Sequence, residues 1–248
     1  QLVDGPEVHK FCTGLRERFK DKVIIGSYDK CDRFAGLALK LHAFHRFLSD
    51  CPGWRSSIVL VQYVSASTDH DIEDTSSLLQ QLEQMAAETN KAFGQPGEPP
   101  LVTICVDALD QMTRLGLLQA TNVLLDTSIN DGLNLMPFLF YAAHARDRLG
   151  AVILSEFCGC SRLLTGAFIV NPWSPAAVVV ALDQALRLEP NQQAERFAGD
   201  LSYVESQTVT EWVEENMATL RTALQLRGGP TRVSRFAIGF GFQEGGYE

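Results

Sequence analysis

The sequence predicts an α/β protein built on a doubly wound parallel sheet. Short apolar, β-branched runs alternate along the chain with longer amphipathic segments, and strands that alternate with helices form parallel sheets covered on both faces. The central run 122–126 is typical of a buried parallel strand, and it leads through a glycine-containing turn into the helix-prone segment 133–145. The 248 residues suffice for one substantial core, or at most two small ones.

Apolar spacing assigns the elements of the first half of the chain. The acidic stretch 69–74 suits the start of a long helix because of the helix dipole, and loop 94–100 is rich in glycine and proline. The expected elements are a helix within 1–20, a strand at 22–28, a helix at 36–49, a strand at 57–64, a helix from about 69 to 93 and a strand at 101–106.

The second half continues the alternation. Ser174 and Pro175 supply an N-cap and a first-turn proline for one of its helices. We expect a helix at 107–118, a strand at 122–126, a helix at 133–145, strands at 150–154 and 167–170, and helices ending near 188, 204 and 226. Six such strands form one domain, whose ligand lies at the carboxyl ends of the strands, near the switch in strand order.

Composition limits the classes of binding partner and the cellular compartment that we expect for this protein. The net charge of −9 and the lack of a basic run disfavour nucleic acid and anionic membranes, and no stretch is apolar enough to span a membrane. The chain begins in mid-pattern without a signal-like segment, which favours a piece of a longer protein. Its cysteines lack the spacing of a disulfide framework, which predicts reduced thiols and a cytoplasmic location. They are Cys12, Cys31, Cys51, Cys105, Cys158 and Cys160.

The central turn, 128–137, is the first candidate for a binding site. Asp131 suits the N-cap of the helix that follows, and Gly132 lets a ligand approach the backbone closely. The free amides of the first helical turn are suited to bind an anion.

Four motifs in fixed order and spacing carry a family resemblance. They are Asp131–Leu135 (Asp-Gly-Leu-Asn-Leu), Leu154–Phe157 with Gly159, Gly166-Ala167, and Val170–Trp173 (Val-Asn-Pro-Trp). From about Lys22 to Phe242 the chain resembles the nucleotide-sugar half of trehalose-6-phosphate synthases, which are retaining glycosyltransferases. The resemblance implies a Rossmann-like fold, the carboxyl-terminal domain of a GT-B enzyme. It also implies glucose transfer from UDP-glucose to glucose-6-phosphate, without a metal or a cofactor beyond that donor.

The resemblance also implies that parts of the protein are missing. The family's acceptor domain has no counterpart here, and Phe236–Phe242 resembles the segment that precedes a phosphatase-like domain in plant-type members. We therefore expect a nucleotide-sugar domain over 1–230 and a tail, 231–248, that leads toward a following module. The expected partners are the amino-terminal transferase domain and a phosphatase-like module or a catalytic paralogue.

The positions that hold the diphosphate in the family are only partly kept. Lys30 replaces an arginine and keeps the charge without its bidentate fork, whereas Ala35 replaces a lysine. Arg33, between them, is able to compensate. Alternatively, Lys30 and Arg33 are solvated loop charges.

The ribose and glucose contacts are mixed. Leu139 occupies the position of the glutamate that holds the ribose, and a leucine cannot accept those hydrogen bonds. Asp131, which contacts the donor sugar in the family, is kept, together with Gly132, Asn134 and the diphosphate-binding amides of Leu135 and Met136. The arginine that faces the acceptor phosphate in the family has no counterpart, because residues 56–90 contain no lysine or arginine.

Other candidates are weaker. His42 and His45 lack further ligands for a metal, and the pair Cys158 and Cys160 lacks a second pair for zinc. Glu156 is either a structural cap or a cleft residue. Three functions remain open: a nucleotide-sugar domain with an eroded site and a regulatory or structural role, the donor half of an active synthase, or an interaction scaffold without a ligand.

Overall fold

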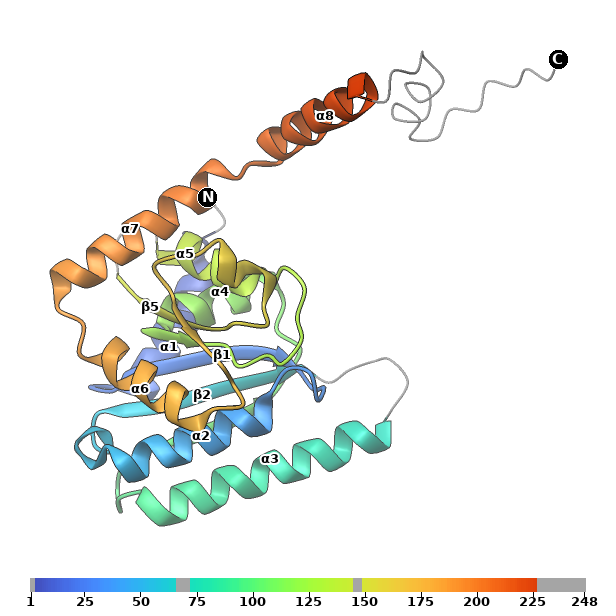
Figure 1. The fold of residues 1–248 in the computed structure, drawn as a ribbon. Helices are drawn as coiled ribbons and strands as arrows, with labels where there is room; N and C mark the ends of the chain where they lie inside the picture. Colours follow the sequence, from blue (N-terminus) through green and yellow to red (C-terminus); the bar gives the residue numbers. More distant parts are fainter. Residues whose placement is uncertain (1–2, 66–71, 145–148, 227–248) are drawn as a thin grey trace. The chain divides into compact units, whose positions relative to one another are not determined.

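The computed structural model describes residues 3–65, 72–144 and 149–226. Helices and strands alternate as the apolar spacing predicts (Figure 1). The elements are α1 (Pro6–Arg18), β1 (Val23–Lys30), α2 (Leu37–Asp50), η1 (Pro52–Trp54), β2 (Ile58–Ser65), α3 (Ile72–Phe93), β3 (Val102–Val106), α4 (Gln111–Ala120), β4 (Val123–Leu125), α5 (Met136–His144), β5 (Ala151–Ser155), η2 (Gly159–Arg162), β6 (Phe168–Val170), α6 (Pro175–Leu186), α7 (Pro190–Ser206) and α8 (Val209–Leu226).

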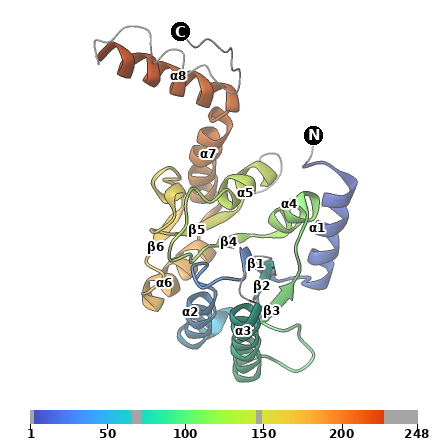
Figure 2. The same ribbon diagram turned by 90° about the vertical axis from the view of Figure 1, so that its right-hand side faces the viewer.

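The sheet has six parallel strands in the order β3-β2-β1-β4-β5-β6. Helices α2, α3 and α6 cover one face, and α1, α4 and α5 cover the other (Figure 2). This is the doubly wound α/β architecture that the sequence predicted. The strand order reverses between β1 and β4, and ligands of such sheets bind at the carboxyl ends of the strands beside that point.

Helix α2 shows how the apolar pattern forms the core. Leu37, Leu41, Phe44 and Leu48 recur at helical spacing, and all four are at most 3% exposed. They pack against β1, β2 and α6 in the main apolar cluster. Burial of a side chain of this size contributes about 1.5–3 kcal/mol, so this face alone fixes α2 on the sheet.

Three element boundaries differ from the prediction, each for a local reason. β1 continues to Lys30, because its whole length pairs with β2 in register. α4 begins only at Gln111, because Asp110 is its N-cap and accepts a hydrogen bond from the Thr113 amide at 2.8 Å. α5 begins at Met136 rather than at Leu133, because the backbone of Asn134 is left-handed, with φ of 53°.

The chain divides into two compact units, Gln1–Val204 and Glu205–Glu248. The first holds the sheet and its covering helices, and α8 is the described element of the second. The predicted tail, 231–248, lies outside the described residues, and so do residues 69–71 of the acidic stretch 69–74. Among the described helices, none is long and apolar enough to cross a membrane.

Candidate functional site

The loops after β1 and β4 lie together at the carboxyl edge of the sheet. The Ile129 amide donates to the carbonyl of Phe34 at 2.8 Å, and the Thr127 hydroxyl donates to the carbonyl of Gly36 at 3.1 Å. A Cβ on Gly36 would lie 2.0 Å from the Thr127 carbonyl oxygen, so only glycine permits this approach. The structure therefore brings together the two loops that carry the predicted site residues.

The loop after β5 joins them. The Gly159 amide donates to the carbonyl of Gly132 at 2.7 Å, and the Asp131 amide donates to that of Phe157 at 3.4 Å. A Cβ on Gly159 would meet the Gly132 oxygen at 2.7 Å, which accounts for glycine there. Gly132, in contrast, faces open space, as its predicted role requires.

Lys30 and Arg33 lie at the start of this edge. Lys30 is the last residue of β1, Arg33 lies in the loop that follows, and both are exposed. The Ala35 amide donates to the Asp32 carboxylate at 2.8 Å, and the Ala35 side chain packs half-buried against the main core. The edge therefore presents two cations to solvent, with an apolar methyl group where the family resemblance expects a third.

The prediction that Asp131 caps the central helix is wrong. Asp131 is exposed and lies upstream of α5, which begins only at Met136. Asn134 is the residue that caps this helix, because its side-chain oxygen accepts a hydrogen bond from the Met136 amide at 3.0 Å. Because the backbone of Asn134 is left-handed, α5 begins only after this residue, and the Asn134 side chain turns back toward the first residue of the helix. Asp131 therefore keeps its carboxylate available to a ligand.

The two amides expected to bind a diphosphate differ. The Met136 amide already donates to Asn134, whereas the Leu135 amide has no acceptor among the residues that the structure describes. Leu139, whose amide donates to the carbonyl of Leu135 at 3.0 Å, is half-buried and packs against a second core cluster. The amides of Leu135 and Met136 and the side chain of Leu139 thus do not provide the full set of contacts that the resemblance implies.

Sequence reasoning missed Asp126, which is buried directly under the central loop. Its carboxylate accepts hydrogen bonds from the amide and hydroxyl of Ser128, the side-chain amide of Asn134 and the thiol of Cys158. Burial, and then the charge of Asp29, raise the pKa of Asp126. The available signal was a carboxylate at the carboxyl end of an otherwise apolar strand run.

The weaker candidates lie in different elements of the structure, the histidines on α2 and the others after β5. His42 is exposed, and His45 is half-buried with its Nδ1 3.0 Å from the Thr89 hydroxyl. Glu156 is exposed at the carboxyl edge, while its amide extends the ladder to Val170 at 2.9 Å. None of the six cysteines, all of which lie in the described ranges, forms a disulfide bond. Within the described ranges, no cluster of three or more histidine, cysteine or carboxylate side chains is placed to hold a metal.

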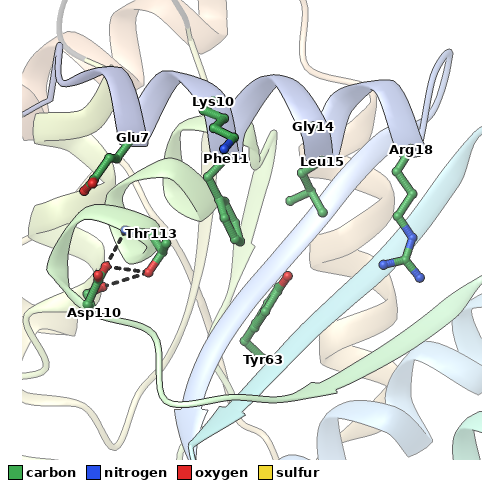
Figure 3. A pocket seen from close by; sticks show the side chains of 9 residues that line it. All are labelled: Glu7, Lys10, Phe11, Gly14, Leu15, Arg18, Tyr63, Asp110 and Thr113. Carbon is green, nitrogen blue, oxygen red and sulfur yellow. Dashed lines mark hydrogen bonds between the residues drawn. The ribbon is translucent and has the colours of Figure 1, made fainter.

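A cavity of about 560 Å³ lies elsewhere, between α1, β2 and the start of α4 (Figure 3). Phe11, Leu15 and Tyr63 line it, and Lys10 and Arg18 extend from α1 beside them. Burial raises the pKa of Tyr63 to about 12, so its hydroxyl stays protonated at neutral pH. None of the predicted site residues lines this cavity.

Comparison with known proteins identifies relatives over most of the chain. The profile of glycosyltransferase family 20 matches residues 1–222. The alpha,alpha-trehalose-phosphate synthase (UDP-forming) 1 of Arabidopsis thaliana is 31% identical over 221 residues, 89% of this chain and 23% of that protein. The corresponding synthase of Candida albicans is 33% identical over 204 residues, 81% of this chain and 41% of that protein.

Solved structures share the fold. The trehalose-6-phosphate protein from E. coli bound with UDP-2-fluoro glucose matches with a TM-score of 0.78 and 26% identity, over 86% of this chain and 49% of that chain. The N-terminal domain of a Candida albicans trehalose-6-phosphate phosphatase also matches with a TM-score of 0.78, at 25% identity, over 88% of this chain and 46% of that chain. The chain thus spans about half of these structures, and less of the longer relatives.

Proposed function

This chain belongs to glycosyltransferase family 20, and we propose that it is the nucleotide-sugar domain of a trehalose-6-phosphate-synthase-like protein whose donor site has weakened. Its role in trehalose metabolism is then regulatory or structural rather than catalytic. One observation carries this proposal. Leu139, at the position where the resemblance expects the ribose-binding glutamate, presents an apolar side chain that packs against the core. An unpaired ribose hydroxyl beside it costs about 1–3 kcal/mol.

The diphosphate contacts support the same proposal. Ala35 offers no charge, and the Met136 amide is already bound to Asn134, so Lys30, Arg33 and the Leu135 amide remain for the phosphates. Asp131 and Gly132 retain access to a donor sugar. Such a site holds UDP or UDP-glucose weakly.

Similarity to the N-terminal domain of a trehalose-6-phosphate phosphatase supports a non-catalytic role. The N-terminal domain of that phosphatase shares the fold of this chain. We therefore propose a phosphatase-like module or a catalytic paralogue as the partner. Six cysteines without a disulfide bond favour a reducing, cytoplasmic compartment.

The donor half of a working synthase is the second candidate. It is favoured by the exposure of both Lys30 and Arg33 at the carboxyl edge, where two cations are able to neutralise a diphosphate. In that case the preceding transferase domain completes the cleft. A scaffold without a ligand is the third candidate.

Titration of the chain with UDP by calorimetry separates the three. We expect a dissociation constant of about 1 mM that weakens with added salt, because few charged contacts remain. Lys30→Ala should weaken binding further, whereas Lys20→Ala, on the exposed end of the α1–β1 connection, should not. A low micromolar constant would favour the active donor half, and no binding at all would favour the scaffold.

Glucosyl transfer is the second measurement. We expect no trehalose-6-phosphate from UDP-glucose and glucose-6-phosphate with this chain, because residues 56–90 contain no lysine or arginine for the acceptor phosphate. Turnover above the buffer blank that Asp131→Ala abolishes would contradict the proposal.

A further inference from the structure

The carboxylate of Asp126 organises the loop between β4 and α5. Its Oδ1 accepts from the Ser128 amide at 3.1 Å and from the Cys158 thiol at 3.1 Å. Its Oδ2 accepts from the Ser128 hydroxyl at 3.1 Å and from the Asn134 side-chain amide at 2.8 Å. One side chain thereby joins the end of β4, the central loop and the loop after β5.

The Asp126 carboxyl group acts as the acceptor in these contacts. The Ser128 amide, the Asn134 amide group and the Cys158 thiol all donate, so an asparagine in place of Asp126 would turn its own donors toward some of them. Burial and the charge of Asp29 oppose ionisation and raise the pKa of Asp126, and the ammonium of Lys40 and these donors offset only part of that effect. A buried carboxylate with so many donors is stable only where the surrounding loop is fixed.

Asn134 transmits this order to the helix. Its Nδ2 donates to Asp126, and its Oδ1 accepts from the Met136 amide at 3.0 Å. Its backbone, with φ of 53°, occupies the left-handed region, which non-glycine residues seldom adopt. The side-chain hydrogen bonds to Asp126 and to the Met136 amide hold the turn.

We propose that Asp126 is a positioning residue that acts through Asn134 and fixes the nucleotide-sugar loop, Asp131–Met136. By holding Asn134, it keeps the Met136 amide bound within the protein and leaves the Leu135 amide to face a ligand. This inference rests on the proposed function, because only a bound nucleotide sugar gives the loop geometry a purpose. It adds a residue that none of the four sequence motifs contains.

Hydrogen exchange at single amides tests the linkage without a ligand. In Asp126→Asn we expect the Met136 amide to exchange at least about tenfold faster than in the wild type, since Asn134 loses its anchor. Asn134→Ala should have a similar effect. Because both act on one linkage, the double variant should exchange no faster than the faster single variant. The Leu124 amide in β4 reports global stability and should change less than Met136.

Asp200→Asn is the matched control. Asp200 is equally buried, and it accepts from the Tyr141 hydroxyl at 2.6 Å and from the Gly166 amide at 2.9 Å. This variant should lower the melting temperature without selective exchange at Met136. Unchanged exchange at Met136 in Asp126→Asn, or additive effects in the double variant, would overturn the proposal.

Two milder variants serve if Asp126→Asn does not fold. Cys158→Ala removes one donor to Asp126 and the long contact of its sulfur with the Asn134 amide group at 3.9 Å, and Asn134→Gly keeps the left-handed turn while removing all the side-chain contacts of Asn134. We expect faster exchange at Met136 in both, with the larger increase in Asn134→Gly. No increase in either variant would overturn the linkage.

UDP titration of the same variants tests the consequence for binding. We expect Asp126→Asn to weaken UDP about three- to tenfold, since a mobile loop loses preorganisation, and Asp200→Asn to leave it unchanged. If UDP binds the wild type and Asp126→Asn equally well, Asp126 does not position the site. If UDP binds neither, the proposed function is wrong, and the exchange at Met136 still decides whether Asp126 acts through Asn134.

Discussion

The ammonium of Lys40 lies 2.6 Å from Oδ2 of Asp29, and the Lys40 side chain is completely buried. Lys40 also donates to the hydroxyl of Ser27 and to the side-chain oxygen of Gln62, at 3.0 Å for the latter. The Gln62 amide group donates to the same Asp29 oxygen at 2.8 Å. This network joins α2 to β1 and β2 just below the carboxyl edge that carries Lys30.

Lys40→Met should destabilise the fold strongly. It leaves the Asp29 carboxylate, only 9% exposed, without its cation, and an uncompensated buried charge costs about 3–5 kcal/mol. Urea unfolding followed by circular dichroism measures the change. Lys30→Met, which removes an exposed lysine from the same region, should stay within about 0.5 kcal/mol of the wild type. Equal losses in the two variants would show that the buried ion pair contributes nothing specific.

His144 should make the stability fall in mild acid. Burial lowers the pKa of its imidazole, although the carbonyls of Phe140 and Thr121, which face its two ring nitrogens, favour the protonated ring and partly oppose this. The unfolded chain therefore takes up the proton first, so the stabilisation is complete above about pH 6.5 and is lost as the pH falls below that value.

Melting temperatures measured between pH 5 and pH 8 test this prediction, because this range spans the ordinary histidine pKa of about 6.5. His144→Gln keeps a hydrogen-bond donor without a titrating group. The advantage of the wild type over this variant should shrink as the pH falls. A difference that is constant across the range would contradict the assigned direction.

Substitution by alanine should affect the stability of the fold very differently at two glycines of the carboxyl edge. Gly36→Ala places a Cβ 2.0 Å from the Thr127 carbonyl oxygen at a backbone with φ of 66°, and should cost about 2–4 kcal/mol. Gly132→Ala meets open space and should leave the melting temperature nearly unchanged. If Gly132 faces the ligand, its alanine variant should nevertheless weaken UDP. Normal UDP binding by Gly132→Ala would remove Gly132 from the site.

Local apolar spacing was enough to predict the sheet and its helices. The face of α2 that carries Leu37 and Phe44 has helical period, and the run 122–126 reads as a strand without any knowledge of its neighbours. Adjacency of the β1 and β4 loops also followed, because parallel strands place their carboxyl ends on one edge.

The buried polar groups could not be predicted in the same way. Helical spacing puts Lys40 on the same face of α2 as Leu37 and Phe44, but its acceptors Asp29 and Gln62 come from two other elements, which spacing within the helix does not reveal. Asn134 differs again, since its left-handed backbone is held by Asp126 across the loop. Contacts of this kind depend on tertiary geometry, which residue spacing does not contain.

Two substitutions together should repair the donor site. Ala35→Lys with Leu139→Glu should tighten UDP about 100-fold, because each regained charge-assisted hydrogen bond contributes about 1.5–3 kcal/mol.

Both positions are half-buried, so the new charged ends are able to reach solvent and ligand while their stems stay packed. Ala176→Lys with Ala198→Glu makes the same charge change at exposed positions of α6 and α7, and should leave UDP binding unchanged. Melting temperature comes first, since a buried carboxylate at position 139 would destabilise the second core cluster. A double variant that melts like the wild type but binds UDP no better would show that Ala35 and Leu139 do not line a former donor site.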